Sequence, residues 1–390
     1  MKRISRFVWV LLIAGLLTSH LLLAQPQPIL TENCAEADSS LKTGQNVRIL
    51  FWNLENLFDY KDDSITTDEA FTSGGAMHWT YTKLQTKISH VAKTILTAGE
   101  WNPPAIIGMC EVENRYVLNK LIYYSPLKSI GYRIIHRDSP DRRGIDVAML
   151  YRPDRFEPMH CEWITIRFPF DTVVKTREIL YTKGLLLSTD TIHLFVNHWP
   201  SRRGGVAVSA PRRNYVAAVL REKVDSLFRQ PHPPAPSPTR EGEIPDPASR
   251  IAYPVSRIAY PYILIMGDFN DEPENESLKT IVGARLDTSG LKPNDLVNIM
   301  YLKAGREGSH KFREHWGLLD QFIVSGNLLD NQNRLYADPR SVRIFKPPFL
   351  LEDDLRYLDK KPKRTFLGPR YKGGFSDHLP VYVDIVVRQL

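Results

Sequence analysis

The stretch Tyr262-Ile263-Leu264-Ile265-Met266-Gly267-Asp268-Phe269-Asn270 joins an apolar run to an acid and an amide. The run over residues 262–266 predicts a buried strand. Asp268 and Asn270 would then stand just past the strand end, where a site at the mouth of a sheet has its polar side chains. An aspartate at this place is also a common turn residue or helix cap. This stretch alone therefore leaves both interpretations open.

Four other stretches have the same form, with acids, amides or histidines at the end of an apolar run. They are Phe51-Trp52-Asn53-Leu54-Glu55-Asn56, Gly108-Met109-Cys110-Glu111-Val112-Glu113-Asn114, Val196-Asn197-His198-Trp199-Pro200-Ser201-Arg202 and Gly374-Phe375-Ser376-Asp377-His378-Leu379-Pro380. Taken singly, each is explained as well by a turn, or by a histidine satisfied within the core. Five such stretches in one chain favour a shared site.

The rest of the chain alternates short apolar runs with helical patterns, which predicts a mixed α/β domain of two or more layers. Leu84, Ile88, Val91 and Ile95 recur at helical spacing, and a second helix is expected after Asn114. Strands are expected at residues 47–53, 105–110, 147–151, 184–188, 192–197, 262–266, 321–324 and 381–387. The pattern does not define how these strands are ordered in a sheet.

The chain resembles the endonuclease/exonuclease/phosphatase family. The resemblance rests on Trp52-Asn53, Glu111, Gly267-Asp268-Phe269-Asn270 and Ser376-Asp377-His378, which occur in the family's order and with roughly its spacing. Leu319-Asp320-Gln321-Phe322-Ile323 is similar to the aspartate-bearing strand that precedes the family's final Ser-Asp-His. The resemblance runs over residues 47–387 apart from a proline-rich insertion. It implies a four-layered α/β sandwich, in which two mixed β-sheets pack face to face with helices outside.

The resemblance also implies a divalent cation, which neutralises phosphate oxygens and stabilises the leaving oxygen. Magnesium prefers hard oxygen ligands and keeps several waters, so one or two carboxylates suffice. Glu111 is the first ligand expected, with Asn53 beside it and Asp377 and Glu55 completing the inner or outer shell. Mg²⁺ is the expected ion, with Mn²⁺ or Ca²⁺ as alternatives.

The catalytic roles carried over from the family fall on five residues. Asp268 orients or activates the attacking water, and Asn270 holds the phosphate. His378 stands against the phosphate, with Asp320 fixing its tautomer and raising its basicity. A charged His378 would stabilise the transition state, and a neutral one would act as base. His198 would protonate the leaving oxygen, as the histidine found here in deoxyribonuclease-like and sphingomyelinase-like members can.

Two neighbouring features bear on the substrate. Arg202 and Arg203 follow the His198 stretch and would hold a second phosphate, since guanidinium groups suit phosphate oxygens; a solvated loop explains them equally well. Gln321 follows Asp320 where inositol-phosphate phosphatases have an arginine. This departure argues against a phosphoinositide substrate.

The N-terminus has the form of a secretory signal. Lys2, Arg3 and Arg6 precede an apolar run that ends near Ala24, which predicts a signal peptide over residues 1–24. An uncleaved membrane anchor is the alternative, because the run is close to spanning length. With cleavage, the protein would be exported to the periplasm or the extracellular space. Cleavage would lower the formal net charge from +7 to +4, a mildly basic balance that suits a polyanionic substrate.

The mature chain is expected to be one domain. Residues 25–45 are polar and predict a flexible leader, and residues 46–390 form the endonuclease/exonuclease/phosphatase domain. Residues 230–260 are rich in proline and repeat Ser-Arg-Ile-Ala-Tyr-Pro, which predicts a disordered insertion. Three cysteines are too few for a disulfide framework. Cys110 is expected to be a buried thiol, and a bridge between Cys34 and Cys161 stays open.

These features predict an exported metal-dependent phosphodiesterase, with DNA or RNA as the expected substrate. A sphingomyelinase-type phospholipase acting on a lipid head group is the alternative, and an exposed apolar hairpin would favour it. The run over residues 344–351 is a candidate for that hairpin, but a packed edge explains the run equally well. A non-catalytic binding protein is a third class, but it predicts a missing ligand or base, and all expected positions are filled. No obligate protein partner is evident, and a monomer is expected.

The signal interpretation makes a direct prediction. We expect the exported protein to begin at Gln25, because the small side chain of Ala24 ends the apolar run. Intact-mass measurement of the secreted protein checks this, and Ala24→Trp should block processing. Recovery of the chain in the membrane with residues 1–24 attached would show an anchor instead.

Overall fold

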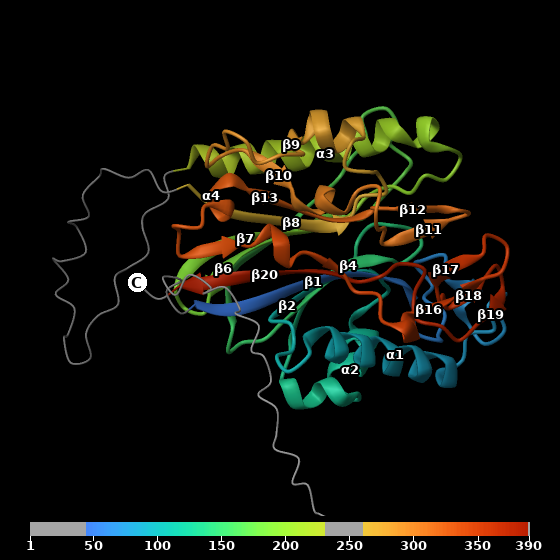
Figure 1. Cartoon of the computed structure of the whole chain (residues 1–390). Coiled ribbons are helices and arrows are strands. Elements are labelled where there is room, and N and C mark those ends of the chain that lie inside the picture. The colour runs from blue at the N-terminus through green and yellow to red at the C-terminus, as the bar shows by residue number, and fades with distance from the viewer. Residues whose placement is uncertain (1–43, 231–259, 389–390) are drawn as a thin grey trace, which may run out of the picture. The chain divides into compact units, whose positions relative to one another are not determined.

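A computed structural model describes residues 44–230 and 260–388. Within these residues, two β-sheets pack face to face between outer helices (Figure 1). The signal peptide, the leader before residue 44 and residues 231–259 of the insertion lie outside the described residues, as does Cys34. Strand β1 begins at Gly44, two residues before the expected start of the domain.

The first sheet contains both termini of the described chain. Its order is β14-β20-β1-β2-β4-β3, with β15 also paired to β20. β1 and β2 run parallel and the other pairs are antiparallel, so the sheet is mixed. The strands are β1 Gly44–Leu57, β2 Ile106–Val112, β3 Arg133–His136, β4 Asp146–Tyr151, β14 Leu335–Ala337, β15 Arg343–Ile344 and β20 Val381–Arg388.

The second sheet is mixed as well. Its order is β5-β6-β7-β8-β13-β10-β9, and the pairs β7–β8 and β9–β10 are parallel. The strands are β5 Phe156–Ile164, β6 Ile179–Leu186, β7 Asp190–His198, β8 Tyr262–Asp268, β9 Ala284–Arg285, β10 Leu296–Asn298 and β13 Asp320–Ser325.

Helices cover the outer face of each sheet. α1 and α2 lie against the first sheet and α3 against the second (Figure 1). The helices are α1 Tyr81–Gly99, α2 Arg115–Tyr123, α3 Val206–Arg229 and α4 Gly326–Leu329, with short helical turns η1 Glu69–Phe71, η2 Pro126–Ile130, η4 Ser277–Ile281, η5 Ile299–Lys303, η6 Pro339–Ser341 and η7 Pro348–Leu350. The four-layered sandwich expected from the sequence is confirmed.

Three small hairpins lie outside the two sheets. They are β11 His310–Phe312 with β12 His315–Gly317, β16 Leu351–Asp354 with β17 Asp359–Pro362, and β18 Phe366–Leu367 with β19 Arg370–Tyr371. All three lie toward the right in Figure 1. The first hairpin connects β10 to β13 of the second sheet, and the other two connect β15 to β20 of the first.

Residue alternation along the strands divides the core into two layers. In β8, Leu264 and Met266 belong to the cluster between the sheets, whereas Ile263 and Ile265 belong to the cluster beneath α3. A strand buried on both faces needs such a continuous apolar run, because successive side chains point to opposite sides. This explains why residues 262–266 are recognisable as a strand from sequence alone.

Local signals account for the first helix. The side chain of Thr80 accepts a hydrogen bond from the backbone N–H of Lys83, which caps the N-terminus of α1. The four apolar residues expected on one face, Leu84, Ile88, Val91 and Ile95, are all buried. Among residues 44–230 and 260–388, no helix is both long and apolar enough to cross a membrane.

Gly267 is required at the end of β8. A Cβ atom there would come within 2.5 Å of the Asn197 Cβ and 2.6 Å of its carbonyl oxygen on the neighbouring strand β7. Because backbone cannot move away easily, any larger residue would separate β7 from β8. The glycine therefore allows His198 and Asp268 to stand side by side at the strand ends.

Candidate active site

The five stretches singled out in the sequence meet at one edge of the two sheets. The parallel pairing of β1 with β2 sets Asn53 opposite Cys110, and that of β7 with β8 sets His198 opposite Asp268. The antiparallel β13 begins there, with Asp320 opposite Asp268. Parallel strands end at the same edge, so the residues that follow them converge.

Asn53 links the two sheets. Its amide nitrogen lies 3.3 Å from Glu111 Oε1 in the first sheet and 3.0 Å from Asp268 Oδ2 in the second, and donates to both. Its Oδ1 accepts from the backbone N–H of Glu55 at 2.9 Å. Asn53 therefore orients two carboxylates through its nitrogen while its oxygen is engaged. Direct ligation of a metal by Asn53 stays a prediction.

Glu111 owes its direction to an irregularity in β2. Its φ is 59°, in the left-handed region, and the β2–β4 register shifts between Cys110 and Val112. Such a residue costs of order 1–3 kcal/mol and persists only when its surroundings fix it. The Asn56 backbone N–H donates to Glu111 Oε2 at 3.0 Å and supplies part of this fixation.

Glu113, two residues further on, is turned away from this site. Its Oε2 accepts from the backbone N–H of Asp59 at 2.5 Å and from the side chain of Asn114 at 3.0 Å. Burial raises the pKa of Glu113 to about 9. The carboxyl is therefore protonated near neutral pH, and its hydrogen bond to Asp59 stabilises the loop after β1.

His378 is held in place on several sides. Its Nδ1 lies 2.7 Å from Asp320 Oδ2, and its backbone carbonyl accepts from Trp52 Nε1 at 2.9 Å. Ser376 Oγ accepts from the His378 backbone N–H and donates to the Asn53 carbonyl. The late Ser-Asp-His stretch is thus joined to β1, which comes first in the domain.

His378 carries a proton in this arrangement. Burial opposes the charged imidazolium, but the carboxylates of Asp320 and Asp268 outweigh it and hold the pKa of His378 well above its usual value. Its Nε2 lies 3.9 Å from Asp268 Oδ2. Of the two states left open by the sequence, the structure favours the charged one, which suits electrostatic stabilisation of a phosphoryl transition state.

Asp268 lies at the centre of the polar cluster. Burial raises its pKa to about 7, although the charge of His378 acts in the opposite direction. The Asn270 backbone N–H donates to its Oδ1 at 2.9 Å, and the Asn270 amide lies 3.3 Å from its Oδ2. A carboxylate whose pKa is near neutral suits proton transfer at ordinary pH.

His198 is the neutral counterpart of His378. Its Nε2 lies 3.8 Å from Asp268 Oδ2 and 3.8 Å from Glu111 Oε1. Burial, followed by the nearby charges of Arg177 and Arg143, lowers its pKa well below the usual value. A neutral imidazole accepts a proton more readily than it donates one. The role of leaving-group acid therefore requires His198 to be protonated in the substrate complex.

The carboxylates of Asp377 and Glu55 both pair with the guanidinium of Arg364. Arg364 Nη2 lies 2.9 Å from Asp377 Oδ2, and Arg364 Nε lies 3.1 Å from Glu55 Oε1. Burial opposes the ionised form of Asp377, but His378 and Arg364 outweigh it and lower its pKa. Burial, followed by the charge of Asp377, raises the pKa of Glu55 to about 7. Arg364 lies outside the five polar stretches, and the sequence did not indicate that it belongs to this cluster.

His310 is a second residue that the sequence analysis did not place. Its ring centroid lies 4.6 Å from that of His378, and the two residues form an isolated antiparallel bridge. Burial lowers the pKa of His310 to about 4. His310 belongs to the β11–β12 hairpin. The run Gly308-Ser309-His310, which precedes the Asp320 strand, is the feature of the sequence that could have identified it.

The two predicted phosphate-binding arginines behave differently. Arg202 Nε donates to the Asn270 carbonyl at 2.7 Å, and its Nη2 lies 3.2 Å from Asn275 Oδ1. It therefore braces the loop after β8. Arg203 is exposed and stays a prediction as a phosphate contact.

The residues at this edge suit a hard divalent cation. Ligand atoms lie within 4.8 Å of one another in three overlapping groups, namely Asp268 with Asp320 and His378, His310 with Asp377 and His378, and Cys110 with His198 and Asp268. Asp268, Asp320 and Asp377 supply carboxylate oxygens to these groups, and such hard ligands suit Mg²⁺, Mn²⁺ or Ca²⁺. Buried like charges repel, and a bound cation would relieve that repulsion.

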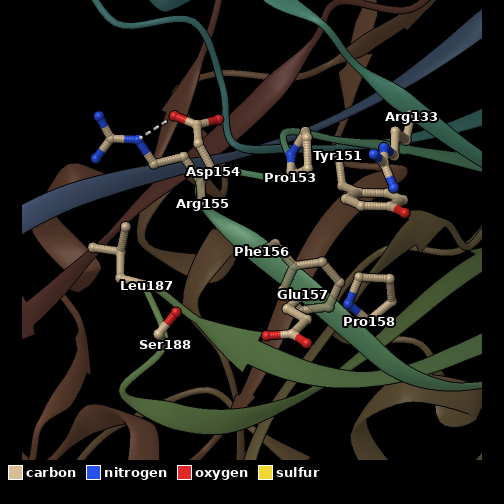
Figure 2. Close-up of a pocket in the computed structure, with 10 residues that line it drawn as sticks. All are labelled: Arg133, Tyr151, Pro153, Asp154, Arg155, Phe156, Glu157, Pro158, Leu187 and Ser188. Atoms are coloured by element: carbon tan, nitrogen blue, oxygen red, sulfur yellow. Dashed lines mark hydrogen bonds and ion pairs between the residues drawn. The ribbon is translucent and has the colours of Figure 1, made fainter.

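Two hollows lie outside the carboxylate cluster. A groove of about 590 Å³ runs beside Arg202 and Asn275 and is lined further by Glu272, Tyr301 and Trp316. A smaller pocket of about 140 Å³ is drawn in Figure 2, where Arg155 pairs with Asp154.

The smaller pocket lies far from the chemistry. Its Tyr151 pairs with Ile106, at the opposite end of the first sheet from Glu111. Its Leu187 follows β6, whose last residue Leu186 pairs with Asp190 at the start of β7, away from His198. We therefore assign it no part in catalysis.

Comparison with known proteins gives a consistent family. A family model described as "Endonuclease/Exonuclease/phosphatase family" matches residues 48–234 and 258–387, on both sides of the proline-rich stretch. No curated protein matches the chain significantly.

Solved structures give the same fold. An endonuclease/exonuclease/phosphatase family protein from Bacteroides thetaiotaomicron is 14% identical, with 89% of this chain and 100% of that one covered and a TM-score of 0.50. A mannosyl-6-phosphatase from the same organism is 15% identical, with coverage of 87% and 99% and a TM-score of 0.50. ANGEL2, described as a 2′,3′-cyclic phosphatase, is 12% identical, with coverage of 89% and 96% and a TM-score of 0.51.

The buried carboxyl of Glu113 makes stability depend on pH. Its folded pKa of about 9 exceeds that of an unfolded glutamate, near 4.3. The folded state thus holds a proton that the unfolded chain has released, and stability falls as pH rises from about 4.5 to about 9. We expect Glu113→Gln to raise the unfolding free energy at pH 8 by on the order of 2 kcal/mol, and to change it little at pH 5. Urea unfolding in the presence of chelator measures the unfolding free energy at both pH values. Glu314→Gln is the control, because Glu314 is exposed. If the unfolding free energy of Glu113→Gln depends on pH as that of this control does, the raised pKa of Glu113 is contradicted.

The pairing of Asp320 with His378 predicts a catalytic defect without unfolding. Asp320→Asn keeps the size of a fully buried side chain but no longer favours the imidazolium. We expect kcat to fall by about 10²- to 10⁴-fold, comparable to the loss of an orienting aspartate elsewhere. The pKa of His378, followed by NMR, should also fall. Near-normal kcat at saturating metal would show that Asp320 is only structural.

Proposed function

The chain belongs to the endonuclease/exonuclease/phosphatase family of phosphoester hydrolases, and from this we propose that it is a divalent-metal-dependent phosphodiesterase acting on nucleic acid. The observation that carries the proposal is the pair of histidines on either side of Asp268. His378 is held charged and His198 neutral, each within 4 Å of the same carboxylate. The charged His378 can stabilise negative charge on a phosphate, and Asp268, whose pKa is raised to about 7, can accept a proton from water.

The proposed roles follow from these positions. Asp268 orients the attacking water and accepts its proton, which its near-neutral pKa permits. The charged His378, fixed by Asp320, stabilises the negative charge that grows on the phosphate oxygens. Glu111 and Asp377 would hold the cation, with Asn53 orienting Glu111. That cation, when bound, neutralises phosphate charge and lowers the barrier to attack.

A polyanionic substrate is supported by the cations around the carboxylates. Arg143, Arg202 and Arg364 each have side chains 30–49% exposed near these residues. The chain also has a formal net charge of +7. Positive charge concentrated around a site draws in a polyanion and raises its local concentration. Export of the protein stays part of this proposal.

A lipid substrate is the second candidate, and one feature favours it. The segment proposed as an apolar hairpin is packed instead, with Ile344 and Leu350 buried. However, Leu355 and Leu358 in the turn of the β16–β17 hairpin are 85% and 91% exposed, and Leu367 at the end of β18 is 58% exposed. Exposed leucines beside lysines suit the surface of a membrane.

Parallel hydrolysis assays separate these candidates. Plasmid DNA, RNA, sphingomyelin vesicles and bis(p-nitrophenyl) phosphate would be offered with Mg²⁺, Mn²⁺ or Ca²⁺, and with chelator as control. We expect metal-dependent loss of nucleic acid that falls by about 10³-fold or more in His378→Ala, since such a charged group contributes several kcal/mol. Cleavage of lipid alone would keep the site and overturn the substrate. In that case Leu358→Asp should reduce vesicle hydrolysis while leaving bis(p-nitrophenyl) phosphate turnover unchanged.

A further inference from the structure

Arg364 reaches the catalytic edge from outside both sheets. It lies between β17, which ends at Pro362, and β18, which begins at Phe366. The two hairpins that flank it lie at the right of Figure 1, beside the ends of β1 and β20. Neither the strand pattern nor the five polar stretches includes it.

The backbone around Arg364 is firmly anchored. Lys87 on α1 is fully buried, and its ammonium donates to Thr365 Oγ1 at 2.5 Å, to the Glu55 carbonyl at 3.3 Å and to the Phe375 carbonyl. Glu55 Oε2 accepts from the Thr365 backbone N–H at 2.6 Å. A buried ammonium with three acceptors fixes the segment, because releasing it would leave a charge without partners.

A glycine lets the two sides of this segment approach. A Cβ atom at Gly374 would lie 2.1 Å from the Lys363 carbonyl oxygen and 2.2 Å from that of Arg364. Phe375 donates its backbone N–H to the Lys363 carbonyl at 2.6 Å. Arg364 is therefore coupled directly to the chain that leads into Asp377 and His378.

The guanidinium of Arg364 is held at two of its three nitrogens. Nε lies 3.1 Å from Glu55 Oε1 and Nη2 lies 2.9 Å from Asp377 Oδ2. Nη1 has no hydrogen-bond partner among residues 44–230 and 260–388, and the side chain is 39% exposed. Two carboxylates thus orient the group while one nitrogen stays accessible.

The guanidinium of Arg364 lies beside a predicted metal ligand, because its Nη2 is 2.9 Å from Asp377 Oδ2. Glu55, its other partner, donates its backbone N–H to Asn53 Oδ1, and the Asn53 amide contacts Glu111 Oε1 at 3.3 Å. Asp377, which Arg364 contacts, precedes His378 in the chain. A phosphate bound by a cation at Asp377 and His378 would therefore lie beside this guanidinium, whose Nη1 has no partner among the described residues.

We propose that Arg364 binds a phosphate oxygen of the substrate through Nη1, with Glu55 and Asp377 holding the guanidinium in position. The proposal rests on the phosphoester hydrolase function and identifies a substrate-binding residue for it. An arginine can serve both carboxylates and a phosphate at once, because its five N–H groups form a planar fork. A lysine in its place would carry the charge but not span the three partners.

Binding of inorganic phosphate tests the proposal without relying on turnover. Calorimetry on the Mg²⁺-loaded protein would compare wild type with Arg364→Ala and Arg364→Lys. Arg370→Ala is a matched control, because Arg370 is an exposed arginine on the neighbouring hairpin. We expect Arg364→Ala to weaken phosphate binding by about 10- to 100-fold, as for a charge-assisted hydrogen bond, and Arg370→Ala to weaken it less than about threefold.

Affinity for Mg²⁺, titrated without phosphate, separates substrate binding from a structural role. Removing a cation next to Asp377 should leave Mg²⁺ affinity equal or higher, whereas a collapsed site would lose both ligands. Arg364→Lys keeps the charge if the alanine variant fails to fold, and should still bind phosphate at least about fivefold more weakly than wild type. Unchanged phosphate affinity in both variants, or parallel loss of phosphate and Mg²⁺ binding, would overturn the proposal.

These outcomes are independent of the proposed substrate. If wild type binds phosphate through Arg364 but cleaves no nucleic acid, the binding role stands and the nuclease function fails. If it cleaves nucleic acid while Arg364→Ala binds phosphate normally, the function stands and the role of Arg364 fails.

Discussion

The contact on which the site depends is the amide group of Asn53 between two carboxylates. Glu111 stands at the end of one sheet and Asp268 at the end of the other, and the same nitrogen donates to both. This contact forms only if β1, β2 and β8 end at the same level. The close approach of Gly267 to Asn197 and the left-handed backbone conformation of Glu111 both contribute to that alignment. The sandwich therefore does more than bury apolar surface, since it sets the distance between acids that belong to separate sheets.

The two histidines of the polar cluster differ in charge. His378 is charged because two carboxylates face it, while His198 is neutral because burial and two arginines act on it. Arg364 pairs with the carboxylates of Glu55 and Asp377, and the charge of the buried Lys87 acts on both of them. These cations offset part of the negative charge of the acids, and a bound metal ion would offset more. Buried acids without such partners would be costly to ionise.

The strand pattern predicted a mixed α/β domain, and the family resemblance implied the sandwich. Most of the cluster could be anticipated because its residues directly follow regular strands. An apolar run such as residues 262–266 identifies a strand, and Asp268 then has a definite place. Arg364 lies in the loop between two short hairpins, and His310 lies in a third. None of these segments has a periodic pattern, so the sequence offered no place for Arg364 and only a Gly-Ser-His run for His310. The sequence also could not show in which direction side chains point. The side-chain oxygen of Asn53 accepts a backbone N–H, and Ile344 and Leu350 are buried. Both depend on contacts between segments distant in the chain.

The pairing of β1 with β20 has a consequence for biosynthesis. β1 opens the described domain and β20 closes it, and His378 follows every other residue of the cluster along the chain. A nascent polypeptide that has emerged only as far as β13 already has Asn53, Glu111, Asp268 and Asp320, but not the imidazole that Asp320 holds. The polar cluster can therefore be complete only after the last strand has been translated. Its final member is added when the last segment of the domain docks against the first.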